Sequence, residues 1–241
     1  MRVAPLLSIA ALMAVAGCAD IRAINETRDD RQEFSLSGDR LVIDNDGADL
    51  RLVAGAGAAI EVQRSLTGKA TVDDNASWSM DGGTLRLKVK CSGLVPDCGG
   101  RHIVHVPAGV VVEVNSDAPV RAVGLDADFS ATVTDAWLRV EESTGALRLH
   151  AEEGVDVTGA RSANVTVTST GRSVNLGFAS PPDRVEARAA GSVQVSLPGG
   201  PETYRVTAAP GRPALTSDPA SKRTVTATAG VGHTAQVRKV G

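Results

Sequence analysis

The stretch NVTVTSTGRSVNLGFASPPDRVEARAAGSVQVSLP, residues 164–198, contains four short runs in which apolar and polar residues alternate. Two runs begin near Val165 and Val185, and the other two near Val174 and Val193. Alternation with a period of two is typical of a β-strand that turns one face inward. Gly, Ser and Pro residues separate the runs, as turns require. The stretch therefore predicts two interleaved series of strands with a common repeat.

Both series continue over residues 107–241 with a spacing of roughly 19 residues, within the range of solenoid repeats. The first series begins near Val110, Phe129, Leu147, Val165, Val185, Tyr204 and Val225, and the second near Val120, Leu138, Val155, Val174, Val193, Leu215 and Ala235. We predict an all-β chain in which residues 107–241 form about seven coils of a parallel β-solenoid, right-handed and β-helix-like. An antiparallel β-sandwich also has short strands separated by turns and is the alternative.

Residues 34–106 contain less regularly spaced strands, such as RLVID, IEVQR and TLRLKVK, separated by longer polar loops. A solenoid needs ends that do not recruit a strand from another chain. We therefore expect this irregular N-terminal β region, with its cysteine loop, to cover one end. At the other end, Arg238 and Lys239 discourage pairing of the last strand.

The first residues, MRVAPLLSIAALMAVAGCAD, are typical of an export signal. Arg2 precedes an apolar run, from about Val3 to Val15, that is short for a membrane span. The run ends in Ala-Gly-Cys18, which resembles the lipobox of bacterial lipoproteins. The resemblance implies a lipoprotein signal peptide over residues 1–17 and lipidation of Cys18. A cleaved signal with an incidental cysteine is the alternative.

A diacylglyceryl group with palmitate-type acyl chains would hold Cys18 in a membrane, because each buried methylene adds roughly 0.8 kcal/mol of affinity. Residues 18–33 are charged and almost without aromatics, so they are expected to form a solvated tether. We predict a domain on the outer face of the bacterial cytoplasmic membrane. Loss of residues 1–17 removes Arg2 and changes the formal charge from −3 to −4. This mildly acidic domain lacks the basic patch that is typical of nucleic-acid-binding proteins.

The segment CSGLVPDCGGRHIVH, residues 91–105, is a candidate metal or disulfide site. Cys91, Cys98, His102 and His105 are a possible zinc set. Residues three apart on a strand point to opposite faces, however, so the two histidines would not face the cysteines together. Outside the cytoplasm an even pair of thiols is normally oxidised. We predict a Cys91–Cys98 disulfide and no metal.

An acidic turn in DNDGAD suggests calcium, because Asp44, Asp46 and Asp49 flank Gly47. An EF-hand loop needs Gly at its sixth position and Glu at its twelfth, and this turn has neither. A turn between strands is favoured.

The group His150, Glu152 and Glu153 is a candidate for acid–base chemistry. Glycoside hydrolysis needs two suitably separated carboxylates, and sugar rings are normally held on an aromatic platform, but aromatic residues make up 2% of the chain. A turn at the end of a strand is favoured, and no catalytic residue is assigned.

Repeated TVT runs raise the possibility of an ordered-water surface of the ice-binding type. The threonines are Thr132, Thr134, Thr166, Thr168, Thr224 and Thr226. Arg148, Glu186 and Arg205 occupy the equivalent runs between them and would break a flat array. Ordinary solvent-facing strand positions are favoured.

Trp137 is a possible anchor for a partner, because an exposed tryptophan often dominates an interface. The inward phase of AWLRV belongs to Ala136, Leu138 and Val140, which turns Trp137 outward. A register error or a bulge that tucks the ring inside is favoured over this arrangement.

Several motifs together resemble a known family. They are the lipobox, GDRLVIDNDGADLRL, the two cysteines with their loop, VHVPAGVVVEV and AAGSVQVSLPG. They resemble actinobacterial lipoproteins of a domain-of-unknown-function family labelled "putative adhesin", over most of residues 34–241. The resemblance implies an exported β-solenoid and brings no catalytic residues. AGVGHTAQVRK departs from the family's usual Gly-Asp-Val type of turn.

The predicted function is that of a non-enzymatic, membrane-anchored extracytoplasmic lipoprotein with an adhesin-like or other envelope interaction surface. Its partners would be the membrane, through the lipid, and an unknown envelope or protein partner. No cofactor is predicted. The alternatives are a polysaccharide-active enzyme on a β-helix scaffold and a solute-binding lipoprotein, a class that usually has two α/β lobes.

Overall fold

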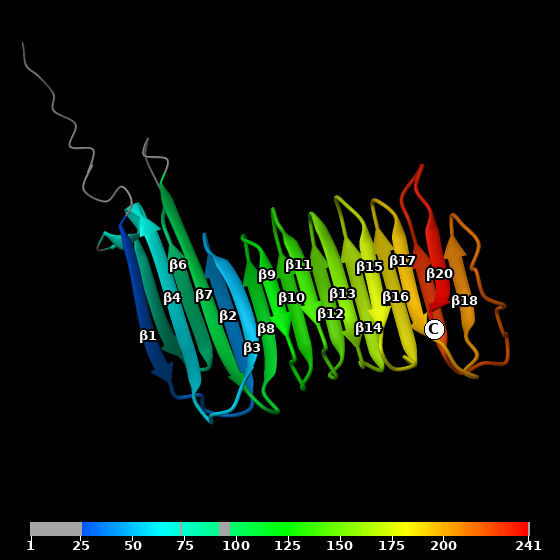
Figure 1. Ribbon diagram of the computed structural model, residues 1–241, viewed down its shortest axis with the longest axis horizontal. Helices are drawn as coiled ribbons and strands as arrows, with labels where there is room; N and C mark the ends of the chain where they lie inside the picture. The colour runs from blue at the N-terminus through cyan, green and yellow to red at the C-terminus, as the bar shows by residue number, and fades with distance from the viewer. Residues whose placement is uncertain (1–25, 73, 92–96, 241) are drawn as a thin grey trace, which may run out of the picture.

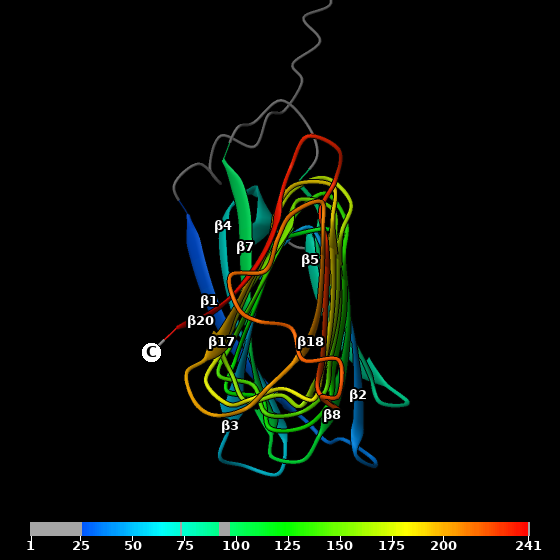
Figure 2. The same cartoon turned by 90° about the vertical axis from the view of Figure 1, so that its right-hand side faces the viewer.

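The computed structural model describes residues 26–72, 74–91 and 97–240. The predicted signal peptide and Cys18 lie outside these residues. The described chain forms two ten-stranded sheets, A and B, that face each other as two layers (Figure 1 and, end-on, Figure 2). Its helical content is the short 3₁₀ segment η2 (Lys69–Thr71). None of the described helical segments is long and apolar enough to cross a membrane.

The prediction of an all-β chain is confirmed by the strands of both sheets. Sheet A contains, in spatial order, β1 (Thr27–Phe34), β4 (Ile60–Gly68), β7 (Cys98–Pro107), β3 (Asp49–Gly55), β9 (Val120–Val123), β11 (Trp137–Glu141), β13 (Gly154–Ala160), β15 (Val174–Phe178), β17 (Val193–Pro198) and β20 (Ala235–Val240). Sheet B contains β18 (Arg205–Ala209), β19 (Thr224–Thr228), β16 (Arg184–Ala189), β14 (Asn164–Ser169), β12 (Leu147–Ala151), β10 (Phe129–Val133), β8 (Val111–Ser116), β2 (Arg40–Asp46), β6 (Thr84–Val89) and β5 (Ala76–Asp81).

From β8 to β17 the chain alternates between the sheets, and each strand pairs in parallel with the strand two elements along. In β14, for example, Val165 lies beside Leu147 of β12 and Val185 of β16. These are the parallel strands expected of a solenoid. Antiparallel pairs among the described strands are β1–β4, β4–β7 and β5–β6. The two facing layers are common to the solenoid and to the sandwich alternative.

The inward side chains of successive coils stack on one another, as the alternation predicts. Val165 and Val167 from sheet B, and Val193 and Val195 from sheet A, are each at most 1% exposed. Burial of one valine side chain contributes roughly 1.5 to 3 kcal/mol. A single apolar cluster contains side chains from both the N-terminal β region and the coils. The two regions therefore share one core.

Val167→Asp is expected to lower the free energy of unfolding by more than about 3 kcal/mol, because the carboxylate would be buried without a partner. Urea denaturation measures this loss. Thr166→Asp is the matched control, since Thr166 is exposed on the same strand, and it should cost less than about 1 kcal/mol. Equal losses in the two variants would contradict the inward register.

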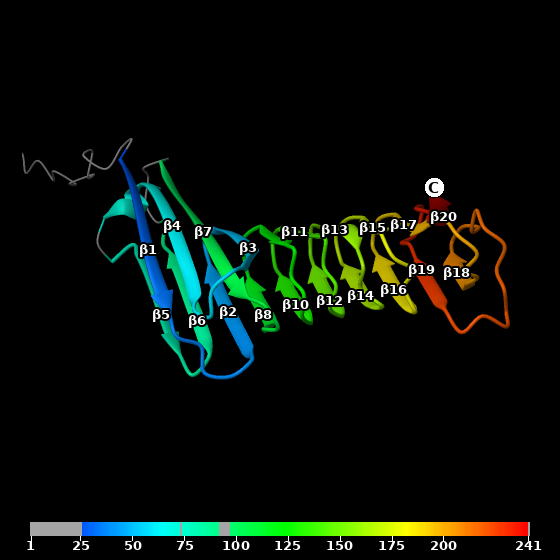
Figure 3. The same cartoon turned by 60° about the horizontal axis from the view of Figure 1, so that its bottom comes forward.

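The N-terminal strands are out of sequence order in space. The strand β2 lies between β6 and β8, and β3 lies between β7 and β9, all in parallel pairs. The β2–β3 coil is thus inserted between coils that follow it in the chain. Beyond it, β1 and β4 extend sheet A in antiparallel pairs and β5 ends sheet B (Figure 3).

The tether predicted over residues 18–33 needs correction at its C-terminal part. Residues 27–33 belong to β1, which pairs with β4 from Thr27 opposite Thr67 to Phe34 opposite Ile60. β1 is an edge strand of sheet A, where charged side chains are tolerated and discourage further pairing. That position explains why a charged segment is ordered.

The C-terminal end is also out of order, and the strand predicted near Leu215 does not form. β17 pairs directly with β20, and β19 lies between β16 and β18. Residues 210–219 contain three prolines, which lack a backbone donor for a ladder. The segment instead crosses the end of the stack, where Ala214 N–H donates one hydrogen bond to the Val237 carbonyl of β20. The first predicted series therefore has all of its strands, and the second lacks one.

The predicted disulfide is present between Cys91, just after β6, and Cys98, the first residue of β7. It closes the connection by which the chain passes from sheet B to sheet A. Closing a loop of this length lowers the chain entropy of the unfolded state and so stabilises the folded protein by roughly 2.5 kcal/mol.

Cys91→Ser should lower the free energy of unfolding by roughly 2 to 3 kcal/mol and leave the fold intact, because Cys91 is exposed and lies outside the strands. Chemical denaturation with and without reductant measures the loss, and circular dichroism checks the fold. The reductant should have no further effect on the variant. If reductant leaves the free energy of unfolding of the wild-type protein unchanged, the disulfide does not stabilise the fold.

Candidate functional site

Trp137 is an exposed aromatic side chain on the outer face of sheet A. It is the first residue of β11, and 42% of it is accessible. Ala136 and Leu138 on either side of it are buried. The expectation that a bulge tucks the ring inside is wrong, because β11 pairs in regular register with β9 and β13. The partner of Trp137 on β13 is Gly154, which has no side chain to cover the ring.

Three arginines stand in a row beside Trp137. Arg51 of β3 is the register partner of Arg121 on β9, and Arg121 is the partner of Arg139 on β11. Neighbouring strands are about 4.8 Å apart, so the row places three like charges close together. Such a row is unfavourable unless carboxylates or a bound anion offset it.

The charges in the row are balanced unequally. Arg121 donates a hydrogen bond to Glu141 at 2.8 Å, and this bond raises the pKa of the guanidinium. Arg139 lies 3.5 Å from Asp156, measured from Nη2 to Oδ2. Arg51 has no carboxylate within ion-pair distance in the described part of the chain. The end of the row nearest β7 is thus the least neutralised.

A depression of about 340 Å³ lies between Trp137 and these arginines. It is lined by Asp49, Leu50, Arg51, Arg101, Ile103, Pro119, Arg121 and Trp137. Arg101 of β7 is exposed and, like Arg51, makes no ion pair with a described residue. Three guanidinium groups therefore surround the depression, against one carboxylate. The Arg139 guanidinium lies over the Trp137 ring, 5.6 Å from its centre.

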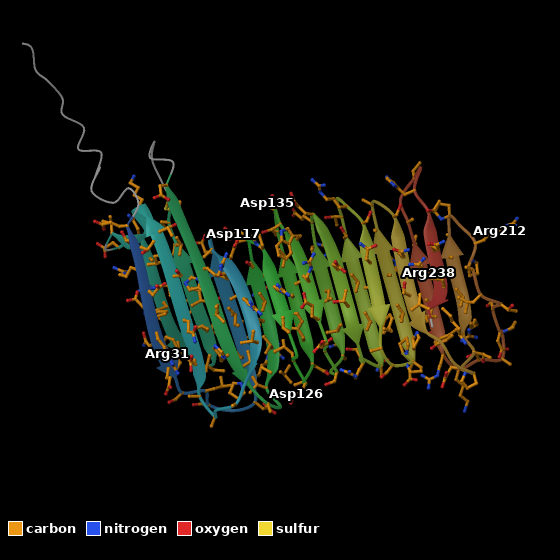
Figure 4. The ribbon with its side chains drawn as sticks, in the orientation of Figure 1. Arg31, Asp117, Asp126, Asp135, Arg212 and Arg238 are labelled. Carbon is orange, nitrogen blue, oxygen red and sulfur yellow. A yellow bond between two sulfur atoms is a disulfide. The ribbon has the colours of Figure 1, made fainter. Side chains whose placement is uncertain are left out.

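Several other carboxylates lie at the turns beside this face, and Asp117, Asp135 and Glu153 line an adjoining depression with Trp137. Figure 4 shows Asp117 and Asp135 at the turns along one rim of the stack and Asp126 at the opposite rim. Asp117 and Asp126 accept backbone hydrogen bonds from Gly47 and Gly109. These two carboxylates therefore hold adjoining turns together.

The candidate zinc set is not assembled. Cys91 and Cys98 are joined in the disulfide. His102 points inward and is fully buried, whereas His105 points outward, with Nε2 3.8 Å from Glu61 and 3.3 Å from Gln63. The opposite orientation of the two histidines agrees with the strand geometry. No group of three metal-binding side chains occurs among the residues that the structure describes.

His102 sits in a polar corner at the N-terminal end of the core. Its register partner on β4 is Arg64, whose Nη2 donates to Asp30 at 2.6 Å and whose guanidinium lies 4.1 Å from the Trp78 ring centre. Burial, and secondarily the charge of Arg64, lower the pKa of His102 from 6.5 to about 4. Neither ring nitrogen has a hydrogen-bond partner among the described residues. His102 is therefore neutral in the folded protein at pH 7.

Acidification should destabilise the fold through His102. The unfolded chain takes up this proton near pH 6.5 and the folded chain near pH 4, so the free energy of unfolding should fall between these values, by about 3 kcal/mol at most. Urea denaturation at pH 7, 5.5 and 4.5 measures the fall. His102→Leu should remove most of it, and His105→Gln, on the outer face, should retain it. A fall of the same size in His102→Leu would contradict this assignment.

The acidic turn of DNDGAD does not form a calcium site. Asp46 pairs with Lys88 at 2.6 Å, and this hydrogen bond lowers the pKa of Asp46. Asp44 accepts from Asn115 at 3.1 Å, while Asp49 lies across the turn on sheet A. The simpler interpretation as a turn between strands agrees with these contacts.

The other two candidate groups are dispersed. Thr166 lies between Arg148 and Glu186 in the register, so the threonine array is interrupted as expected. Glu152 accepts a hydrogen bond from the Asp135 backbone. Glu153 lies on the other side of the turn, beside Trp137.

Sequence reasoning missed Arg51, Arg101 and Arg121. Each stands at an outward position of an alternating run, as many surface residues do. Arg121 and Arg139 are one repeat apart and could have been paired by periodicity. Arg51 could not, because the inserted β2–β3 coil brings it beside a strand from a later part of the chain.

Comparison by sequence finds no matching protein-family model and no matching curated protein. Solved structures that resemble the chain include the following two. One, a "putative cell adhesion protein" from Clostridium sporogenes, is 8% identical with a TM-score of 0.48 and covers 89% of this chain and 100% of its own. The other, a "putative adhesin" from Bacteroides fragilis, is 11% identical with a TM-score of 0.34 and covers 88% and 97%. The adhesin label recurs, but at these values the likeness supports no shared site. Membership of the actinobacterial lipoprotein family stays a prediction.

Proposed function

We propose that the chain is a lipid-anchored, extracytoplasmic, non-enzymatic protein that presents the outer face of sheet A to a component of the cell envelope. The observation that carries this proposal is Trp137, an exposed tryptophan beside Arg51 and Arg101, two arginines without ion pairs to described residues. Exposed Trp and Arg side chains are the residue types that most often dominate binding energy. They stand on a face whose strands are otherwise fully paired.

The alternatives have less support. A glycosidase needs two carboxylates on either side of the scissile bond, and the lining of the depression includes one, Asp49. His150 lies on β12 of sheet B, Glu152 lies in the turn after this strand, and Glu153 lies beside Trp137, so the candidate acid–base group does not converge. A solute-binding lipoprotein usually has two α/β lobes, whereas the described chain is all-β.

The place of the depression along the stack suits an anchored surface. Cys18 precedes Thr27, at the start of β1, by nine residues, so the anchor would reach at most about 30 Å from the N-terminal end. β11 is the sixth strand of sheet A, about 24 Å from β1 at 4.8 Å per strand. With the stack directed away from the membrane, Trp137 would lie clear of the lipid headgroups and accessible from outside.

Cys18→Ala should release the protein from the membrane, because the lipid would be the attachment. Detergent-phase partitioning of the wild-type and variant proteins measures this, and the variant should move to the aqueous phase. Persistent partitioning of the variant into detergent would contradict the anchor.

The released Cys18→Ala protein also tests the surface separately from the anchor. It should co-sediment with purified cell-envelope material. The combined additional changes Trp137→Ala, Arg51→Gln and Arg101→Gln should abolish this co-sedimentation. Arg148→Gln, an exposed arginine of sheet B, is the matched control. Co-sedimentation that survives the three changes would refute the proposed face, and loss after substitution of one carboxylate in the folded protein would favour an enzyme.

A further inference from the structure

We infer that the depression between Trp137 and the arginines binds an anionic saccharide, a sugar unit that carries a carboxylate or sulfate. This inference rests on the proposed function and names the chemistry of its partner. It depends on the charge of the lining, on the aromatic wall, and on the absence of a free strand edge in the strands that form the site.

The charge of the lining selects an anion. Arg51 and Arg101 have uncommitted guanidinium forks, which suit two parallel hydrogen bonds to a carboxylate or sulfate. Arg121 has its Nη2 engaged by Glu141, and its Nε is buried without an acceptor, so it adds positive charge rather than a free fork. Asp49 offsets one of the three charges. A net positive depression remains.

The aromatic wall selects a ligand with an apolar face as well as a charge. The Trp137 ring carries negative potential on its face and favours the weakly positive C–H groups of a sugar ring stacked on it. A volume of about 340 Å³ falls within the range of small-ligand sites and exceeds the needs of a single inorganic anion. A charged sugar unit uses both the ring and the guanidinium forks.

The backbone around the site disfavours an acidic peptide. Peptides often bind by adding a strand to a free sheet edge. Here β3 is paired with β7 and β9, β9 with β3 and β11, and β11 with β9 and β13. The strands of the site therefore offer no free edge. The arginines instead repeat from strand to strand along the stack, a direction in which a polymer with one charge per unit can follow them.

Calorimetric titration of the full-length Cys18→Ala protein with oligogalacturonate tests the inference. Binding should be saturable, should weaken as the ionic strength rises, and should be lost with the fully methyl-esterified oligomer, which lacks the charge. Trp137→Ala and the double variant Arg51→Gln/Arg101→Gln should each weaken it by about tenfold or more. Arg148→Gln should leave it unchanged, and thermal unfolding should show that all variants remain folded.

Five outcomes would overturn the inference: no saturable binding of the oligogalacturonate, equal binding of the methyl ester, undiminished binding by Trp137→Ala, equally tight binding of polyglutamate, or saturation of the site by sulfate alone. Failure here remains distinguishable from failure of the proposed function. If no oligosaccharide binds but co-sedimentation with envelope material still requires Trp137, the ligand class is wrong and the interaction face stands. If co-sedimentation is also independent of Trp137, both are wrong.

Discussion

The parallel register between successive coils is the constraint on which the rest of the structure depends. Each coil must keep its inward side chains in phase in sheets A and B at once, because a slip of one residue would turn a stacked valine to the solvent. Among the described strand pairs of the coils, the register shifts between Val157 and Ala160. Gly159 absorbs this shift with a φ of 64°, a conformation that is costly for a residue with a side chain. The phase is recovered by Phe178, which is buried on the next coil.

The same register creates the surface. Outward positions stack as strictly as inward ones, so a residue type repeated in consecutive coils becomes a row. Arg51, Arg121 and Arg139 form such a row, and its repulsion is only partly offset by Glu141 and Asp156. Threonine or serine at these positions would give a polar face without this repulsion. Because Arg51 has no such carboxylate partner among the described residues, the excess positive charge of the row lies beside Trp137. In the proposed function this charge contributes to binding rather than to stability.

The strands and their inward faces follow from the sequence because alternation is a local property. Val165, Val167, Val193 and Val195 are inward for that reason, and the opposite orientation of His102 and His105 follows from the same rule. The disulfide is predicted from the expected export of the chain and from the even number of thiols that remain when Cys18 is assigned to the lipid. The spatial order of the coils does not follow, because nothing local to β2 or β18 indicates which distant strand will lie beside it. The handedness of the winding also stays a prediction, and so do the anchor at Cys18 and the adhesin-like role.

The inserted β2–β3 coil has a consequence for the order in which the protein can be completed. A chain that crosses the membrane N-terminus first delivers β3 before β7 and β9, the two strands that hold it on either side. Arg51 therefore gains its neighbour on β9 only after Arg121 has emerged. Pairing of strands so far apart in the sequence is slow compared with the stacking of later coils. The strands from β10 to β17 need no such delay, because each finds its partner already in place. At the C-terminal end β18 must again wait, because its partner β19 follows it in the chain. If the chain is exported as proposed, emergence of the N-terminal half alone leaves the charged depression unbuilt. The proposed interaction face is then complete only once β11, which carries Trp137, has crossed the membrane.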